Sequence, residues 1–197
     1  MMIRVLSKYL LRYLISSSVI EATDRNLKIY KYGTEIFISS LVNIVAIVAI
    51  GILTFSIKES VLFMLLLVLL RIYTGGYHAN TYLKCNLLLC INYILVLVCY
   101  NLTPSNCNVM HFIFVSITCV AIILLFCPVE NENKKITPEQ KIKLKKKSVI
   151  LGTIYGTAAV VFNVFKYRIG ILILYTLSSV TIAVIAAKLK ERCGEHG

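Results

Sequence analysis

Long parts of this 197-residue sequence lack charge. No Asp, Glu, Lys or Arg occurs from Cys85 to Val129, and charged residues make up only 15% of the chain, against 58% hydrophobic residues. A soluble domain of this size has too little interior to bury that much apolar surface. The shortage of charge therefore excludes a soluble globular domain and an intrinsically disordered chain.

Other absences narrow the class further. The seven cysteines are an odd number and most lie inside apolar blocks, so a disulfide framework is not expected. No Gly-rich phosphate loop or internal repeat is present. No second His or acidic residue stands at a suitable spacing to complete a metal site. The sequence excludes a disulfide-rich secreted domain, and we expect neither a metal nor a cofactor.

Uncharged segments predict an all-α polytopic membrane protein with about six membrane-embedded helices. A helix needs about 20 mostly apolar residues to cross the hydrocarbon core. The predicted segments are 36–57, 60–70, 86–101, 109–127, 148–165 and 169–187. The segment 60–70 is roughly half the usual length, which leaves open a tilted short span or a re-entrant element. We expect one integral-membrane domain, residues 1–197, with the membrane-embedded core at 36–187.

The N-terminal region, residues 1–30, has a different pattern. Arg4, Lys8 and Arg12 recur every fourth residue and share one helical face, with apolar residues between them. This pattern predicts an amphipathic helix that lies in the cytoplasmic headgroup layer. A signal peptide is the alternative, but charges interrupt its apolar core and no small-residue cleavage site follows.

The net charge of +12 is distributed as expected of a membrane protein rather than a nucleic-acid-binding one. With the N-terminus inside, eighteen Lys and Arg residues fall on the cytoplasmic side of six crossings and three on the outer side. The sequence thus predicts a multi-pass membrane protein with both termini cytoplasmic. The lipid bilayer is the expected partner, and nucleic acid is not.

Chemistry is most plausible in the segment from Arg71 to Cys85. His78 precedes Cys85 by seven residues, and an imidazole near a thiol can remove its proton and produce a nucleophilic thiolate. On one unbroken helix the two would be roughly 10 Å apart along the axis, so direct contact requires a bend. Gly75 and Gly76 supply a flexible backbone there, and form either an oxyanion pocket or only a turn.

The spacing R-x-x-x-G-G-x-H-x-x-x-x-x-x-C, in a small basic chain with six spans, resembles the AgrB family of accessory gene regulator proteins. The Pro/Asn/Lys-containing segment 127–135 resembles that family's loop after the fourth span. The resemblance extends over essentially the whole chain, including the N-terminal amphipathic helix.

The resemblance implies a membrane cysteine endopeptidase of quorum sensing. Members of this family cut the acidic C-terminal tail from an AgrD-type precursor peptide and hold the remainder as a thioester. An internal thiol or hydroxyl then closes a thiolactone or lactone ring. Carried over by motif position, Cys85 is the nucleophile and His78 the general base, while Arg71 and Gly76 match required positions. The resemblance also implies a homodimer, and we expect the active site at the cytoplasmic face.

Several assignments remain open. Arg71 either binds a substrate carboxylate or only snorkels at the end of a short span. The basic residues Lys134, Lys135 and Lys141 either contact the acidic tail of the substrate or only satisfy the positive-inside rule. Four residues are weak candidates for a third member of the site: Asp24, Glu35, Asn80 and Asn86.

The segment Thr137-Pro138-Glu139-Gln140 predicts a helix start with a capping box, and this helix continues into the fifth span.

The non-enzymatic alternative for the whole chain is a small multi-span peptide transporter or scaffold. A transporter typically carries charged or broken-helix sites near the bilayer midplane, and these spans show almost none. A second enzymatic alternative is an acyltransferase that uses Cys85 as a relay.

Overall fold

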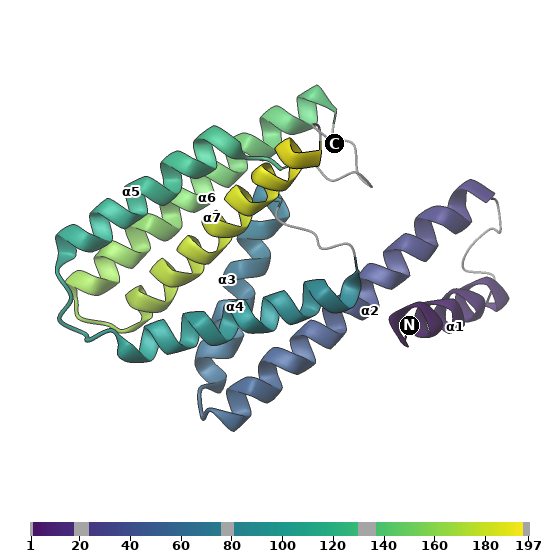
Figure 1. Ribbon diagram of the computed structural model, residues 1–197, viewed down its shortest axis with the longest axis horizontal. Coiled ribbons are helices and arrows are strands. Elements are labelled where there is room, and N and C mark those ends of the chain that lie inside the picture. Colours follow the sequence, from purple (N-terminus) through teal and green to yellow (C-terminus); the bar gives the residue numbers. More distant parts are fainter. Residues whose placement is uncertain (1, 18–23, 76–80, 130–136, 195–197) are drawn as a thin grey trace.

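A computed structural model describes residues 2–17, 24–75, 81–129 and 137–194. These residues are all-helical, as predicted, and contain no strand (Figure 1). The seven helices are α1 (Met2–Ser16), α2 (Asp24–Leu53), α3 (Ile57–Thr74), α4 (Tyr82–Leu102), α5 (Val109–Phe126), α6 (Pro138–Val164) and α7 (Ile169–Gly194). Five of them include stretches long and apolar enough to cross a membrane: Tyr30–Leu53, Tyr82–Leu102, Val109–Phe126, Pro138–Val164 and Ile169–Glu191.

The predicted N-terminal helix is present as α1, which packs against α2 (Figure 1). Ser7 is buried, whereas the side chains of Tyr9 and Tyr13 are exposed. Lys8 and Arg12 are exposed as well. The helix therefore buries one face against α2 and keeps aromatic and basic side chains on its other faces, the composition expected of a helix at the membrane interface.

The first span was predicted to extend to residue 57, but α2 ends at Leu53. Phe55 adopts a left-handed backbone conformation, with a φ of 55°. The Ser56 N–H donates to the carbonyl of Gly51 at 2.8 Å, which closes the turn after α2. An uncharged run does not reveal this turn, because Thr54, Phe55 and Ser56 are as compatible with the bilayer as the residues before them.

The predicted segment 60–70 is the middle of a longer helix. α3 is a continuous helix of 18 residues, about 27 Å long at 1.5 Å per residue, and it is not one of the five helices that meet the length and composition of a span. Lys58, Glu59 and Arg71 lie in its first and last turns. The charges at both ends made the apolar stretch look short, although the helix nearly matches a hydrocarbon core of about 30 Å.

Helices α5, α6 and α7 contact one another and form a three-helix group, beside which α3 lies (Figure 1). A Cβ atom on Gly156 would lie 3.1 Å from the Ser116 Cβ of α5, and one on Gly152 would lie 3.1 Å from Ile123 Cδ1. Gly152 and Gly156 thus form a G-x-x-x-G motif that lets α5 and α6 approach closely. This motif was not among the sequence predictions.

α3 connects the three-helix group to the rest of the molecule. The Tyr155 hydroxyl of α6 donates to the Leu66 carbonyl of α3 at 3.1 Å. On the other side of α3, the Ser60 and Tyr93 hydroxyls are 2.6 Å apart, and the Tyr93 ring packs on Phe63 with centroids 4.9 Å apart. These polar contacts lie inside the bundle, where lipid offers no alternative hydrogen-bond partner.

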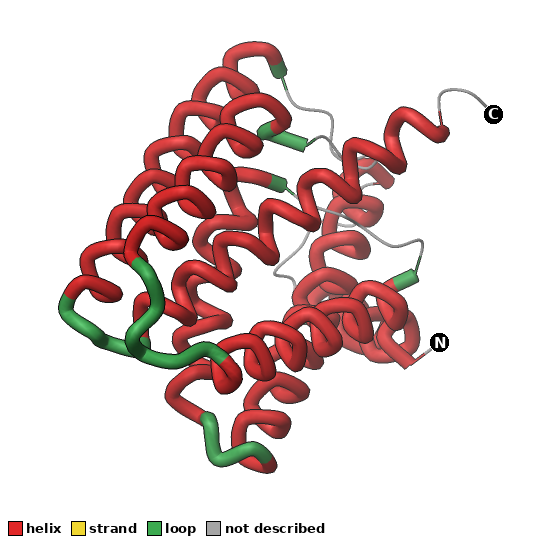
Figure 2. The backbone as a smooth tube through the Cα atoms, turned by 60° about the vertical axis from the view of Figure 1, so that its left-hand side comes forward, coloured by secondary structure: helices red, strands yellow, loops and turns green. Residues whose placement is uncertain are grey.

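One end of the bundle is joined by short loops. Figure 2 shows these loops, in green, gathered on the lower left. There the Arg168 guanidinium lies 4.6 Å from the Tyr100 ring centroid and donates to the Tyr100 carbonyl at 2.9 Å. The hydroxyls of Thr103 and Tyr175 are 2.8 Å apart. These contacts fasten the end of α4 to the beginning of α7.

The predicted capping box of α6 is confirmed. Thr137 Oγ1 accepts from the Gln140 N–H at 3.3 Å, and Gln140 Oε1 accepts from the Thr137 N–H at 3.3 Å. Helix α6 then continues through the lysine-rich stretch into the apolar span, as predicted.

Candidate functional site

The end of α3 is fixed by the segment that follows α5. The Val129 N–H donates to the Thr74 carbonyl at 2.9 Å. Gly75 follows with a φ of 71° and a ψ of −155°, a combination that is essentially restricted to glycine. A Cβ on Gly75 would lie 2.5 Å from the Val129 carbonyl oxygen. The backbone therefore leaves α3 in a direction that requires glycine at position 75.

Cys85 lies in the first turn of α4. Thr81 caps this helix by accepting from the Lys84 N–H at 3.3 Å, and the Cys85 N–H donates to the Thr81 carbonyl at 3.1 Å. The thiol-bearing side chain is partly buried. The thiol therefore lies at the N-terminal end of α4.

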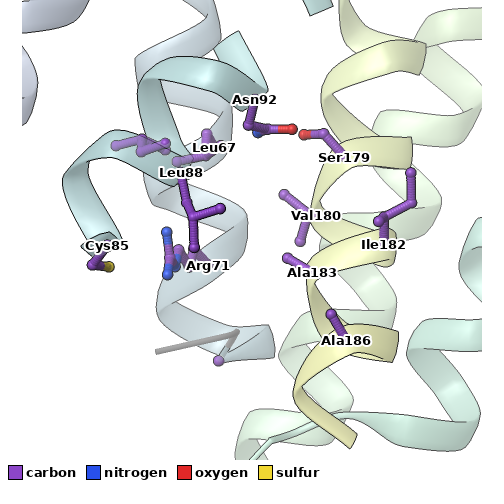
Figure 3. A pocket seen from close by; sticks show the side chains of 12 residues that line it. Leu67, Arg71, Cys85, Leu88, Asn92, Ser179, Val180, Ile182, Ala183 and Ala186 are labelled. Carbon is purple, nitrogen blue, oxygen red and sulfur yellow. The ribbon is translucent and has the colours of Figure 1, made fainter. Parts of the chain in front are cut away.

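A cavity of about 320 Å³ lies between α3, α4 and α7. Arg71, Gly75 and Cys85 all line it, and Figure 3 shows Arg71 between Cys85 on α4 and the small side chains of Ala183 and Ala186 on α7. Three residues that the sequence analysis singled out are thus brought to one cavity. The other lining residues are Leu67, Leu88, Leu89, Asn92, Ser179, Val180 and Ile182.

Four predicted site residues cannot be placed. His78 and Gly76 lie outside the described residues, as do Lys134 and Lys135. His78 follows Gly75 by three positions in the sequence and precedes Cys85 by seven. Its contact with Cys85 stays a prediction.

Two of the candidates for a third member have other partners. Glu35 accepts a hydrogen bond from the Tyr82 hydroxyl at 2.9 Å, and Asn86 accepts one from the Ser39 hydroxyl at 2.8 Å. Both bonds join α2 to the first turns of α4. These residues hold the helix that carries Cys85. Asn80 and the side chain of Asp24 lie outside the described residues.

Several described lysines lie on α6 and α7, and the role predicted for Lys141 stays a prediction. Lys141 is exposed in the first turns of α6 and does not line the cavity. Lys147 lies farther along α6, with its ammonium 5.5 Å from the centre of the Tyr73 ring in the last turn of α3. Lys188 of α7 forms an ion pair with Glu191 at 2.6 Å.

Cys127 provides a contrast to Cys85. It is only 4% exposed, just after the end of α5. Burial raises the pKa of the Cys127 thiol to about 12, although the positive charges of Lys188 and Lys145 act in the opposite direction. Cys127 is therefore a thiol at physiological pH and not a nucleophile. Within the described residues, no group of His, Cys, Asp and Glu is arranged to hold a metal ion.

The sequence analysis missed the polar pair at the far end of the cavity. Figure 3 shows the Asn92 amide facing Ser179. Asn92 follows Cys85 by seven residues on the same helix, so the two lie on the same face about 10 Å apart along the axis. The seven-residue spacing of a polar residue from Cys85 on an uncharged span is the sequence feature that could have indicated this pair.

Comparison with known proteins identifies the family. The sequence model of the AgrB family, accessory gene regulator B, matches residues 7–185. The chain belongs to the AgrB family. This matched region includes Arg71, Gly75 and Cys85, and nearly all of the cavity. The protein is thus a multi-pass membrane protein of the AgrB type, a family of quorum sensing.

The AgrB relatives are moderately similar. An AgrB-like protein of Clostridium perfringens (strain SM101 / Type A) is 30% identical over 162 residues, covering 78% of this chain and 75% of the relative. A second AgrB-like protein, of Clostridium perfringens (strain 13 / Type A), is 28% identical, also covering 78% of this chain and 75% of the relative. One from Listeria monocytogenes (serotype 4a, strain HCC23) is 26% identical, covering 64% of this chain and 61% of the relative. No solved structure matches this chain significantly.

Proposed function

We propose that this AgrB-family protein is a membrane-embedded cysteine endopeptidase. It removes the C-terminal tail of an AgrD-type precursor peptide and promotes cyclisation of the remainder into an autoinducing peptide. The observation that carries this proposal is the convergence of Cys85, Arg71 and Gly75 on one cavity. Cys85 is the only nucleophile among these residues, and it lies at the N-terminal end of α4.

In the proposed reaction, His78 accepts the proton of the Cys85 thiol and the thiolate attacks the carbonyl carbon of the scissile amide. The C–N bond breaks, and the amine of the tail leaves with the proton from His78. The peptide remains attached through a thioester. A thiol or hydroxyl within the peptide then attacks that thioester, forms the ring and releases Cys85. The thioester keeps much of the energy of the cleaved bond, so neither a cofactor nor ATP is required.

The remaining site residues receive supporting roles. The backbone at Gly75 and Gly76 stabilises the oxyanion or forms the turn that leads to His78. Arg71 is placed in the cavity with Cys85, which favours contact with substrate over mere snorkelling. Lys134, Lys135 and Lys141 are proposed to attract the acidic tail, together with Lys147 near Tyr73.

The proposal includes the orientation and the partners. The distribution of basic residues favours cytoplasmic termini and an active site at the cytoplasmic face. The substrate partner is the AgrD-like precursor peptide, and the functional unit is a homodimer, as the family resemblance implies.

The decisive experiment measures thiol reactivity and cleavage together. The protein in nanodiscs is treated with iodoacetamide between pH 5 and 9, and alkylation of each cysteine is followed by mass spectrometry. We expect Cys85 to react fastest below pH 8 and to lose that advantage in His78→Ala. An epitope-tagged AgrD-type precursor should be cleaved by the wild type and by Cys90→Ala, but not by Cys85→Ala. Cleavage by Cys85→Ala would refute the proposal, and peptide export without cleavage would favour a transporter or scaffold.

A further inference from the structure

Helices α4 and α7 diverge from a fastened end toward the end that carries Cys85 (Figure 1). At the fastened end, Thr103 and Tyr175 are joined by hydroxyl groups 2.8 Å apart. At the other end the cavity of about 320 Å³ lies between the helices. At this end α7 lines the cavity with the small side chains of Ala183 and Ala186, and in Figure 3 Arg71 lies between them and Cys85. The small residues of α7 therefore leave space in the cavity that Cys85 and Arg71 also line.

The walls of this space are apolar along its length. Arg71 at the Cys85 end is its only charged lining residue among those the structure describes. Asn92 and Ser179 close the far end, about 10 Å from Cys85 along α4. Between these ends the wall consists of Leu, Val, Ile and Ala side chains. A group attached to Cys85 that enters the cavity meets hydrocarbon first and hydrogen-bonding groups only at the end.

We infer that this cavity is the acyl-side subsite of the peptidase: it holds one or two apolar side chains that directly precede the scissile bond while the peptide is attached to Cys85. The inference rests on the proposed function and specifies its substrate class. Ligand pockets measure about 300–1,000 Å³. A cavity at the lower limit of that range accepts part of a peptide and not a complete ring.

The tail does not fit this cavity. An acidic tail has one cationic partner there, Arg71, followed by an aliphatic wall on which carboxylates would lose hydration without compensation. The acyl part must stay bound until the ring closes, and an apolar side chain packed beside the thioester excludes the water that would hydrolyse it. The cavity thus suits the part of the substrate that remains, and the lysines outside it suit the part that leaves.

Ala183 is the specificity-determining residue in this proposal, because a larger side chain there fills the space opposite Cys85. Ala183→Phe removes most of the cavity and Ala183→Leu removes part of it. The matched control is Ala121→Phe, which adds the same group at an exposed position on α5. Size-exclusion profiles and thermal unfolding in nanodiscs report whether each variant keeps the wild-type fold.

The probes are N-acetyl-Leu-Leu and N-acetyl-Gly-Gly chloromethyl ketones, which present an acyl-side dipeptide to the thiol. The Cys85 thiolate displaces chloride, so that one C–S bond forms and one C–Cl bond breaks. Rates are measured by mass spectrometry relative to Cys99, which is exposed on α4 and reports partitioning of each reagent into lipid. We expect the Leu-Leu reagent to alkylate Cys85 at least about tenfold faster than the Gly-Gly reagent, a usual discrimination for an apolar pocket.

In Ala183→Phe the Leu-Leu preference should disappear while the size-exclusion profile and the melting temperature are kept. Ala183→Leu should be intermediate and Ala121→Phe unchanged. Equal rates for both reagents in the wild type, or an undiminished preference in folded Ala183→Phe or Ala183→Leu, would overturn this inference. Those results would leave the proposed peptidase function intact. That function would be refuted only if the precursor is still cleaved without Cys85.

Discussion

Single residues explain why the end of α3 has one backbone path. Gly75 combines a positive φ with close contact to the Val129 carbonyl, so both conformation and space require glycine. From the sequence we anticipated a turn at Gly75, but not this contact. Val129 is more than fifty residues away in the chain, and no local pattern reports a long-range contact.

Gly75→Ala should destabilise the protein by about 1–3 kcal/mol and strongly reduce precursor cleavage, because Ala must leave the glycine-only conformation and displace Val129. Thermal unfolding in nanodiscs and the cleavage rate measure the two effects. The control is Gly33→Ala in α2, where nothing lies within 4 Å of the added Cβ. We expect it to be neutral or slightly stabilising. A Gly75→Ala protein as stable and active as this control would contradict the assignment.

Cys127 should resist alkylation between pH 5 and 9. With its pKa raised to about 12, roughly one molecule in a thousand carries the thiolate at pH 9, whereas an ordinary cysteine is largely ionised there. As the control, Cys127 should be alkylated readily once the protein is unfolded in SDS. Rapid iodoacetamide labelling of Cys127 in the folded protein at pH 9 would show that the thiol is not buried as described.

The sequence predicted which helices exist and their order along the chain, but not which helices pack against one another. Uncharged length is a strong signal for a span, and it located all six core helices. It does not identify their neighbours, because lipid and protein interior are equally apolar and no face of a helix such as α5 stands out. Contacts such as Tyr155 with Leu66, or Ser39 with Asn86, depend on that missing information.

The α5–α6 contact should be sensitive to size at Gly156. Gly156→Val places side-chain atoms against Ser116, only 3.1 Å from the expected Cβ position, and overpacking of this kind costs about 1–3 kcal/mol. The melting temperature in nanodiscs should fall. Thr157→Val, on an exposed position of the same turn, should leave it unchanged. Equal melting temperatures for the two variants would argue against a close α5–α6 contact.

For the whole molecule, the distribution of lysine and arginine predicts which loops face the cytoplasm. Phe55, between α2 and α3, is 98% exposed and is predicted to face outward. In intact bacteria, Phe55→Cys should react with a membrane-impermeant maleimide. Gln140→Cys, exposed in the first turn of α6, should react only after lysis. The opposite pattern would reverse the orientation and move Cys85 to the outer face.

Because α4 and α7 are joined at one end, a small change in the angle between them there becomes a large displacement at the other end. Cys85 lies eighteen residues from Thr103, about 27 Å along α4. A tilt of about 5° at Thr103 and Tyr175 would displace Cys85 by roughly 2 Å, comparable to a bond length and more than hydrogen-bond geometry tolerates. Two hydroxyl groups at one end of the bundle thereby control the width of the cavity at the other end.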